Sequence, residues 1–140
     1  MTPQQRAETA AAAMWANDQA TPALGIALEE IAPGAATLSM TVQPHMLNGH
    51  RTCHGGFIFT LADSAFAFAC NSHGSGALAA HCDIFFLAPA REGDRLVATA
   101  IERHREGRTG LTDVRVTAGE TVIAEFRGHS RAVPHQWVPS

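Results

Sequence analysis

Hydrophobic and polar residues alternate over most of the second half of the chain, and this alternation predicts β-strands. The same pattern occurs twice nearer the start, on either side of a Pro-Gly turn at residues 33–34. Before these strands, an Ala-rich stretch that Thr2 can cap and Pro3 can open favours a helix. The elements expected are a helix over 3–16, a break with at most one more turn over 18–25, and strands over 25–32, 36–43, 77–87, 95–105, 108–118 and 121–133.

One segment in the middle of the chain is apolar on every side. Residues 44–54 follow no hydrophobic period, and the stretch over 56–70 then places Phe, Ile, Leu and Ala on all faces of a helix. A helix that is apolar all round is buried. The turns between the four later strands (APAREGD, EG and GE) are short and favour antiparallel pairing of consecutive strands.

These elements predict a single domain over residues 1–140 with an α+β fold, in which an antiparallel sheet wraps around the central buried helix. A helical segment over 1–20 precedes it and a tail over 134–140 follows it. Charged residues make up only 16% of the chain, against about 25% in an average protein. Because so little charge is left to cover a small monomer, part of the surface is expected to face a second copy.

Charge and composition exclude several classes of function. The net charge is −3 and no basic patch is present, so a nucleic-acid partner is not expected. All ten basic residues are Arg, and eight of them lie in 91–131, which places any anion site in the C-terminal half. The N-terminus lacks the pattern of a signal peptide, and no apolar run is long enough to span a membrane. The three cysteines show no disulfide framework. We therefore expect a cytoplasmic protein with no membrane partner.

Asp63 is the residue that does not fit a buried apolar helix. A carboxylate taken out of water without partners costs several kcal/mol, and it responds with a raised pKa or by finding donors. One interpretation is a structural carboxylate with its hydrogen bonds satisfied, or a point where the helix reaches solvent. The other is a nucleophile or general base held in a dry cleft.

Gly55 and Gly56, at the start of the same helix, add the second part of a catalytic site. A helix N-terminus presents free amides and a partial positive charge, and glycines let a ligand approach the backbone. The pair is also compatible with a simple tight turn. With Asp63 it offers what acyl transfer needs, since amides can hold an oxyanion while a carboxylate attacks or activates water.

The spacing of these residues predicts a shared site. Gly55 and Asp63 are eight residues apart, which is about 12 Å along a helix. One reacting carbon has to lie about 3 Å from both groups. Two antiparallel copies about a two-fold axis meet this requirement, so we expect a homodimer in which Gly55 of one subunit meets Asp63 of the other.

Three short motifs follow one another at fixed spacing: Asn48-Gly49, His54-Gly55-Gly56 and Leu61-Ala62-Asp63. In this order they resemble the motif of the hotdog-fold acyl-CoA thioesterases. The runs LADSAFAFACNSHG, FFLAPAREGD and FRGHS are similar to the phenylacetate-degradation (PaaI-type) branch of that family. The resemblance covers about residues 20–133. It implies a hotdog fold and hydrolysis of phenylacetyl-CoA or hydroxyphenylacetyl-CoA thioesters to free acid and coenzyme A.

The resemblance also implies a role for each motif residue. Asp63 is the catalytic carboxylate, the Gly55 amide binds the thioester oxygen, Asn48 orients water or substrate, and His54 lines the same turn. No metal and no cofactor is implied, since coenzyme A is part of the substrate. A related branch that acts on aromatic thioesters of the menaquinone pathway carries Glu at this position, so Asp63 sides with the phenylacetyl type. His81 does not match the small polar residue that some relatives place near the attacking water, which leaves the water-positioning group open.

For coenzyme A the resemblance points to two strand edges in the Arg-rich half of the chain. The residues it implies, with the second glycine of the helix start, are Gly56, Arg108, Thr109, Gly110, Arg127, Gly128, His129 and Ser130. The resemblance further implies that the homodimer pairs into a homotetramer.

Other interpretations of the same residues remain open. A zinc site would use residues of one loop and one strand, although their spacing matches no standard ligand set: His45, His50, Cys53, His54, His81, Cys82 and Asp83. An acyl-CoA hydratase, a non-catalytic acyl-CoA-binding module, a medium-chain thioesterase and a nucleophilic Cys53 or Cys82 are further alternatives. Six phenylalanines are interpreted as core, with part of them able to form an aryl pocket: Phe57, Phe59, Phe66, Phe68, Phe85 and Phe86.

Overall fold

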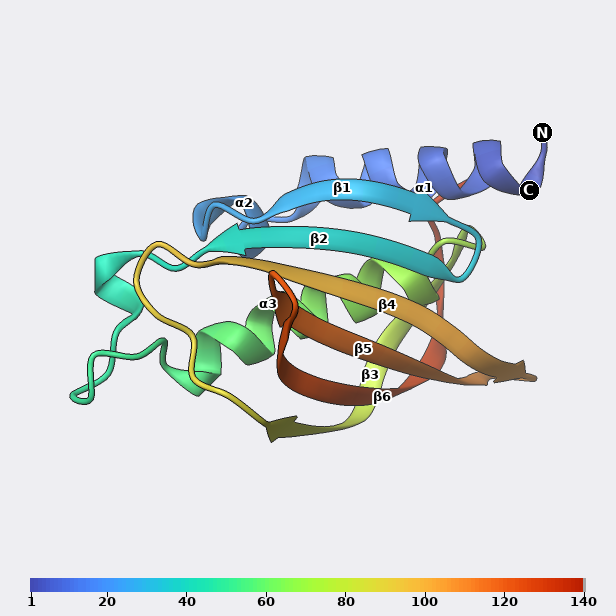
Figure 1. The fold of residues 1–140 in the computed structure, drawn as a ribbon. Helices are drawn as coiled ribbons and strands as arrows, with labels where there is room; N and C mark the ends of the chain where they lie inside the picture. Colours follow the sequence, from blue (N-terminus) through green and yellow to red (C-terminus); the bar gives the residue numbers. More distant parts are fainter. Residues whose placement is uncertain (140) are drawn as a thin grey trace.

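The computed structural model describes residues 1–139 and shows one curved sheet wrapped around a long helix (Figure 1). The elements lie within a few residues of the positions that the hydrophobic pattern predicts. They are α1 (Pro3–Asn17), α2 (Ala20–Ala23), β1 (Ala27–Ala32), β2 (Ala35–Thr41), a 3₁₀ turn (Pro44–Met46), α3 (Gly55–Cys70), β3 (Ser75–Phe86), β4 (Arg95–Glu106), β5 (Thr109–Ala118) and β6 (Thr121–Gln136). The predicted α+β hotdog fold, an antiparallel sheet around a central helix, is confirmed.

All neighbouring strands of the sheet are antiparallel, in the order β1-β2-β4-β5-β6-β3. The predicted pairing of the strands on either side of APAREGD is wrong, because β3 pairs with β6 and β4 pairs with β2. The linking segment crosses from one side of the sheet to the other instead of turning back. Its backbone is held on the way by hydrogen bonds from Leu87 N to Ile123 O (2.8 Å), Cys53 N to Ala90 O (2.7 Å) and Val42 N to Asp94 O (2.9 Å).

The helix α3 forms the centre of the hydrophobic core. Leu61, Ala62 and Ala65 are fully buried, and Phe66 and Phe68 are 1% exposed. The expectation of a buried central helix is therefore confirmed for most of its surface. The exception is a half-buried strip that contains Phe57, Phe59 and Asp63, so the helix is not enclosed on every side.

The helix α1 begins with the expected cap. Thr2 Oγ1 accepts a hydrogen bond from Gln5 N (3.1 Å), and Gln5 Oε1 accepts one from Thr2 N (2.8 Å). Its buried face is made of Ala7, Ala10, Ala11 and Met14, and it lies alongside β1 (Figure 1). Within residues 1–139, no helix is long and apolar enough to cross a membrane.

Asn71 joins the C-terminal end of α3 to β3 and to Trp137, the residue after the last strand. Its Nδ2 donates to Ala67 O (2.8 Å) and Ala77 O (3.0 Å), and its Oδ1 accepts from Ala77 N (2.8 Å) and from Trp137 Nε1 (2.9 Å). The start of β3 pairs with the end of β6 (Ser75 with Gln136), so β6 continues to Gln136, three residues beyond the expected 133. The expected tail over 134–140 therefore starts inside this strand, and its last residue lies outside the described chain.

Candidate active site

The first two amides of α3 are free to bind a ligand. The cap residue His54 has an extended backbone and makes no capping hydrogen bond with its exposed side chain. No atom of residues 1–139 accepts a hydrogen bond from Gly55 N or Gly56 N. Unpaired N–H groups and the helix dipole together make such a terminus attractive to an oxyanion. The structure thus provides the donors that the sequence predicts at this point.

An aromatic ring lies against Gly55. A Cβ atom added at Gly55 would lie 2.9 Å from Cζ of Phe86, closer than real Cβ contacts allow. This ring, together with Thr52, Cys53, Ile58 and the segment 87–89, lines a groove of about 480 Å³ beside the start of α3. The groove brings the end of β3 and the start of α3 together around the free amides.

Asp63 lies half-buried in the middle of α3, and burial raises the pKa of its carboxyl. No side chain or amide of residues 1–139 forms a hydrogen bond or an ion pair with it, so the interpretation of a satisfied structural carboxylate is not supported within the protomer. Burial, followed by the nearby charge of Asp63, raises the pKa of the Cys82 thiol on β3. Asp63 and Gly55 are separated by two turns of helix, about 12 Å.

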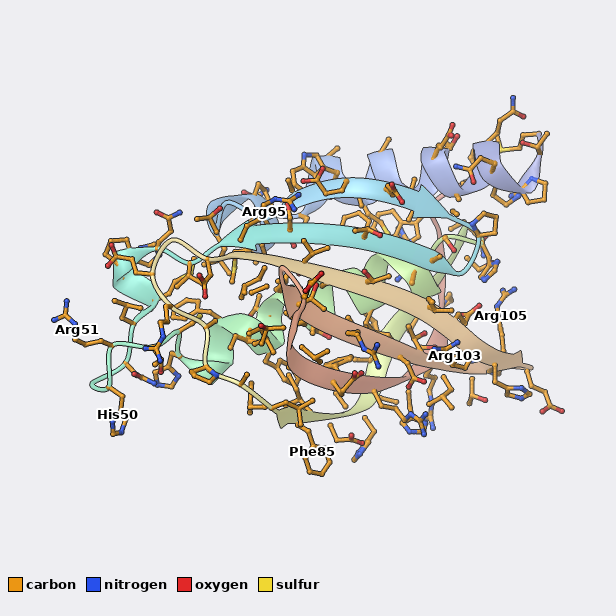
Figure 2. The ribbon with its side chains drawn as sticks, in the orientation of Figure 1. His50, Arg51, Phe85, Arg95, Arg103 and Arg105 are labelled. Carbon is orange, nitrogen blue, oxygen red and sulfur yellow. The ribbon has the colours of Figure 1, made fainter. Side chains whose placement is uncertain are left out.

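Asn48 organises the loop that leads into α3. Its Oδ1 accepts hydrogen bonds from His50 N (3.0 Å), Thr52 N (3.1 Å) and Thr52 Oγ1 (3.2 Å). These bonds fix the amide plane, and Nδ2 remains as a donor that no acceptor among residues 1–139 uses. The loop extends from the body of the molecule, with His50 and Arg51 pointing away from the sheet (Figure 2). Arg51 has a φ of 64°, which is uncommon for a residue with a side chain.

His81 lies on β3, with an exposed side chain. Its Nε2 is 3.8 Å from a carboxylate oxygen of Asp83, and its ring stands edge-to-face against His129 of β6, 5.7 Å between centroids. His129, one of the residues expected to contact coenzyme A, is exposed as well. No group of three His, Cys, Asp or Glu side chains in residues 1–139 is arranged to hold a metal ion.

The residues expected to bind coenzyme A fall into two groups. Arg108, Thr109 and Ser130 line a small hollow of about 40 Å³ that also touches Cys70, the last residue of α3. Gly110 pairs with Ser130 across the two strands, and a Cβ atom on Gly110 would lie 2.7 Å from Ser130 Oγ. This group therefore lies at the opposite end of α3 from Gly55, about 22 Å away along the helix.

Arg127 and Gly128 lie elsewhere and have other partners. Arg127 donates from Nε and Nη2 to the carboxylate of Asp113 (2.7 and 3.1 Å), and the pair lines a hollow of about 710 Å³ on β3–β6 that no residue of α3 borders. Gly128 is buried against Phe66, and a Cβ atom there would lie 2.8 Å from two ring carbons. For Gly128 the structure gives close packing as the reason for glycine.

The cysteines are poor nucleophiles in these surroundings. Burial raises the pKa of the Cys53 thiol to about 11. Burial, followed by the charge of Glu102, raises the pKa of Cys70 to about 12. Burial also raises the pKa of the Cys82 thiol. Because thiolates and not thiols attack carbonyl carbon, the raised pKa values of Cys53 and Cys82, the two candidate nucleophiles, weigh against a cysteine mechanism.

The phenylalanines that the sequence groups together separate in the structure. Phe66 and Phe68 belong to the core, whereas Phe85 is 71% and Phe86 is 52% exposed. Phe85 points away from the sheet (Figure 2), and Phe86 turns to Gly55. The signal in the sequence is that Phe86 directly follows an outward-facing residue of β3 and so faces the other side. Its contact with Gly55 could not be predicted, because the start of α3 is distant in the sequence.

The fold is that of a hotdog protein, with unpaired amides at the start of its central helix. Residues 50–125 match the model of the thioesterase superfamily, and the chain belongs to this superfamily. The chain is 48% identical over 122 residues to the acyl-coenzyme A thioesterase PaaI of Escherichia coli, covering 86% of this chain and 87% of that protein. The predicted class, a PaaI-type hotdog thioesterase, is confirmed.

Solved structures agree with this assignment. The Escherichia coli PaaI protein from the phenylacetic acid degradation operon matches with a TM-score of 0.94 and 43% identity, over 96% of this chain and 99% of that chain. A mutant form of the phenylacetic acid degradation protein PaaI from Thermus thermophilus matches with a TM-score of 0.81 and 36% identity, over 83% of this chain and all of that chain (100%).

Proposed function

We propose that this chain hydrolyses acyl-CoA thioesters, with phenylacetyl-CoA and its hydroxylated relatives as the preferred substrates. The observation that carries the proposal is a half-buried, unpaired carboxylate with a raised pKa in the same helix as two unpaired N-terminal amides. The similarity to acyl-coenzyme A thioesterase PaaI supports both the reaction and the phenylacetyl group. A cytoplasmic location is part of the proposal.

The residues divide the chemistry between them. The Gly55 N–H donates to the thioester oxygen and stabilises the negative charge that develops on it. Asp63 then attacks the carbonyl carbon and the C–S bond breaks, so that coenzyme A leaves as a thiolate that takes up a proton, and water cleaves the resulting mixed anhydride to the free acid and the Asp63 carboxylate. In the other route Asp63 takes a proton from water that attacks the carbonyl carbon, and the tetrahedral intermediate releases the free acid and the thiolate, which takes up that proton. A raised pKa makes the Asp63 carboxylate a stronger base than an exposed Asp, which suits either role. Asn48 Nδ2 is the donor available to orient water or substrate near the carboxylate.

The proposed enzyme is a homodimer with shared sites. The edge of β3 is unpaired and carries exposed apolar side chains, among them Leu78 at 64%. An exposed, apolar edge strand of 12 residues is a template for pairing with another chain. Phe86 lies at the Gly55 end of α3, whereas Ala77 lies at the Asn71 end. Antiparallel pairing of two β3 strands therefore sets the two α3 helices antiparallel and brings Asp63 of one subunit toward Gly55 of the other.

We infer the place of coenzyme A from the same arrangement. In a protomer the hollow around Arg108, Thr109 and Ser130 is about 22 Å from Gly55 along α3. In the antiparallel pair that end of one helix lies beside the Gly55 end of the other. Arg108 forms no ion pair with residues 1–139, whereas Arg127 is held by Asp113. We therefore expect Arg108 to contribute more to the binding of phosphate. Pairing of two dimers into a tetramer is an additional expectation.

A thioester panel tests the proposal. Wild-type protein is assayed for multiple turnover of phenylacetyl-CoA, hydroxyphenylacetyl-CoA, hexanoyl-CoA and acetyl-CoA, and Asp63→Asn is the matched inactive control. We expect the largest kcat/KM for an arylacetyl thioester and a steep loss in the variant. Higher kcat/KM for hexanoyl-CoA would support the medium-chain alternative, and binding without turnover would support the acyl-CoA-binding module. After one turnover in heavy-oxygen water, label in the Asp63 carboxylate identifies a nucleophile, and label only in the product acid shows that water attacks the acyl carbon.

Mixed dimers test the shared site. An Asp63→Ala chain and a Gly55→Pro chain are each expected to be inactive. When they are combined, mixed dimers contain one site with both Asp63 and Gly55 intact, so part of the activity should return. If heterodimers form and no activity returns, each site is built within one subunit and this part of the proposal is wrong.

A further inference from the structure

Phe86 occupies the space next to the proposed oxyanion donor. Three of its ring atoms, Cζ, Cε1 and Cε2, lie 2.9, 3.3 and 3.4 Å from the position of a Cβ atom at Gly55. The ring edge therefore points at the backbone whose N–H is unpaired. More than half of the Phe86 side chain is exposed in the protomer, although the rings of Phe66 and Phe68, which α3 carries into the core, are almost completely buried.

The groove beside this contact is lined mainly by apolar groups. Ile58 comes from α3, and Leu87, Ala88 and Pro89 come from the segment after β3. None of the residues that line it carries a charge. Apolar walls with a small number of polar groups are typical of sites that hold the apolar part of a ligand, and here the polar groups are the amides at the start of α3.

The geometry limits which part of a substrate can reach Phe86. A thioester oxygen held by Gly55 N–H lies about 2.7–3.1 Å from that nitrogen. The carbonyl carbon is one bond further, so acyl atoms that extend into the groove from it pass the ring of Phe86 within contact distance. An acetyl group ends at the first of these atoms. A phenylacetyl group continues with a ring, which can pack on Phe86 in the offset or edge-to-face arrangement that aromatic pairs prefer.

We propose that Phe86 is a specificity-determining residue, with its ring serving as the wall against which the acyl group of the substrate packs while Gly55 holds the thioester oxygen. The inference rests on the proposed thioesterase function and names the residue that selects for large apolar acyl groups. It explains why an apolar side chain remains exposed beside two free amides. It also gives Gly55 a second reason to be glycine, since the ring needs the space of a Cβ atom.

The experiment compares two substrates in four proteins. We measure kcat/KM for phenylacetyl-CoA and for acetyl-CoA in wild type, Phe86→Ala, Phe86→Leu and Phe85→Ala. Phe85→Ala is the matched control, because Phe85 is the adjacent residue on the opposite side of β3 and points away from the sheet (Figure 2). Phe86→Leu keeps an apolar wall and covers the case in which Phe86→Ala does not fold. Light scattering records the oligomeric state of each variant.

The expected result is a change in the ratio of the two kcat/KM values. Phe86→Ala should lower this ratio about tenfold, at the lower end of what changes in a hydrophobic pocket produce. Phe86→Leu should lower it less, and Phe85→Ala should retain the wild-type ratio. A role of Phe86 in folding or dimer formation alone would lower both kcat/KM values together and leave the ratio unchanged, which overturns the inference. An equal change of the ratio in Phe85→Ala also overturns it.

A second measurement tests the contact without substrate. Gly55→Ala should lower the melting temperature, because the new methyl group meets the ring, and Phe86→Ala added to Gly55→Ala should restore part of it. No recovery means that the ring does not lie against Gly55 in solution, and the inference fails. Wild-type protein that hydrolyses no thioester would refute the proposed function, and the inference with it. An active wild type with an unchanged ratio in Phe86→Ala refutes the inference alone.

Discussion

Gly128→Ala is expected to destabilise the fold without weakening substrate binding. The glycine lies in β6 directly over Phe66 of α3, and a Cβ atom would lie 2.8 Å from Cε1 and Cζ and 2.9 Å from Cδ1 of that ring. The ring is 1% exposed and packs on Phe126, 5.8 Å between centroids. Because neither ring can swing into solvent, the strand has to move away from the helix.

The magnitude follows from the absence of free space. Overpacking a core costs about 1–3 kcal/mol, and the contact with a fully buried ring places the cost of Gly128→Ala at about 3 kcal/mol. For a protein of this size a loss of 1 kcal/mol lowers the melting temperature by about 3–4 °C, so we expect a drop of about 10 °C. Urea unfolding gives the free energy of unfolding, and circular dichroism gives the melting temperature. The KM for phenylacetyl-CoA should stay within about twofold of wild type, since a well-folded site retains its contacts.

Two further variants make the result decisive. Gly49→Ala is the matched control, because no heavy atom lies within 4 Å of the added Cβ atom, and its effect should stay within about 0.5 kcal/mol. Phe66→Leu combined with Gly128→Ala removes the ring and should cost less than the sum of the single changes. A Gly128→Ala protein that melts within about 1 °C of wild type would refute the packing argument. An increase in KM with unchanged stability would return Gly128 to the coenzyme A site.

Three other outcomes are expected. Burial raises the pKa of Asp63, so ionisation of this carboxyl destabilises the fold. The destabilisation is absent below the unfolded pKa of about 3.9 and develops as the pH rises through the folded pKa. Asp63→Asn should therefore melt higher than wild type at pH 7 but not at about pH 3, and parallel curves of melting temperature against pH would contradict this. Trp137→Phe removes the hydrogen bond to Asn71 (2.9 Å) and should cost about 1 kcal/mol in urea unfolding with unchanged kcat/KM, whereas a loss of activity at full stability would assign the bond a different role. Cys53, with a pKa of about 11, should resist iodoacetamide at neutral pH in mass spectrometry while activity persists, and rapid alkylation with inactivation would revive the cysteine mechanism.

The local pattern was sufficient to predict most elements because it depends on each segment's own contacts. The period-two alternation of the strands and the all-round apolar surface of the central helix follow from which faces are buried. The expected cap at Thr2 needs only residues three apart, and it is present with both hydrogen bonds. The path from β3 to β4 could not be read in the same way. A segment as short as APAREGD suits a hairpin, and what sends it across the sheet instead is contact with the distant segments at Val42 and Ile123.

The candidate site shows the same division. Gly55 and Asp63 stand out in the sequence because their chemistry conflicts with their surroundings, and the structure retains that conflict as free amides and an unpaired carboxylate. The resemblance implies that Arg127 and Gly128 both bind coenzyme A. Adjacent residues of a strand, however, point to opposite faces. Arg127 reaches Asp113 on one face, and Gly128 meets Phe66 on the other. Whether a glycine makes room for a packed side chain or for a ligand depends on the residue that faces it in the fold. The spacing of residues in the sequence does not reveal that residue.

Three unsatisfied features of the protomer lie beside β3, and this has a consequence for how activity arises. The free amides of Gly55 and Gly56 lie beside the end of β3, and the carboxylate of Asp63 lies near Cys82 in its middle. The strand itself has an open edge with exposed Leu78. Each of these features costs free energy in the separate protomer. Pairing of two β3 edges changes the surroundings of all of them at once. Assembly and activity should therefore rise together as the protein concentration passes the dissociation constant of the dimer, and specific activity that stays constant under dilution into monomers would contradict a shared site.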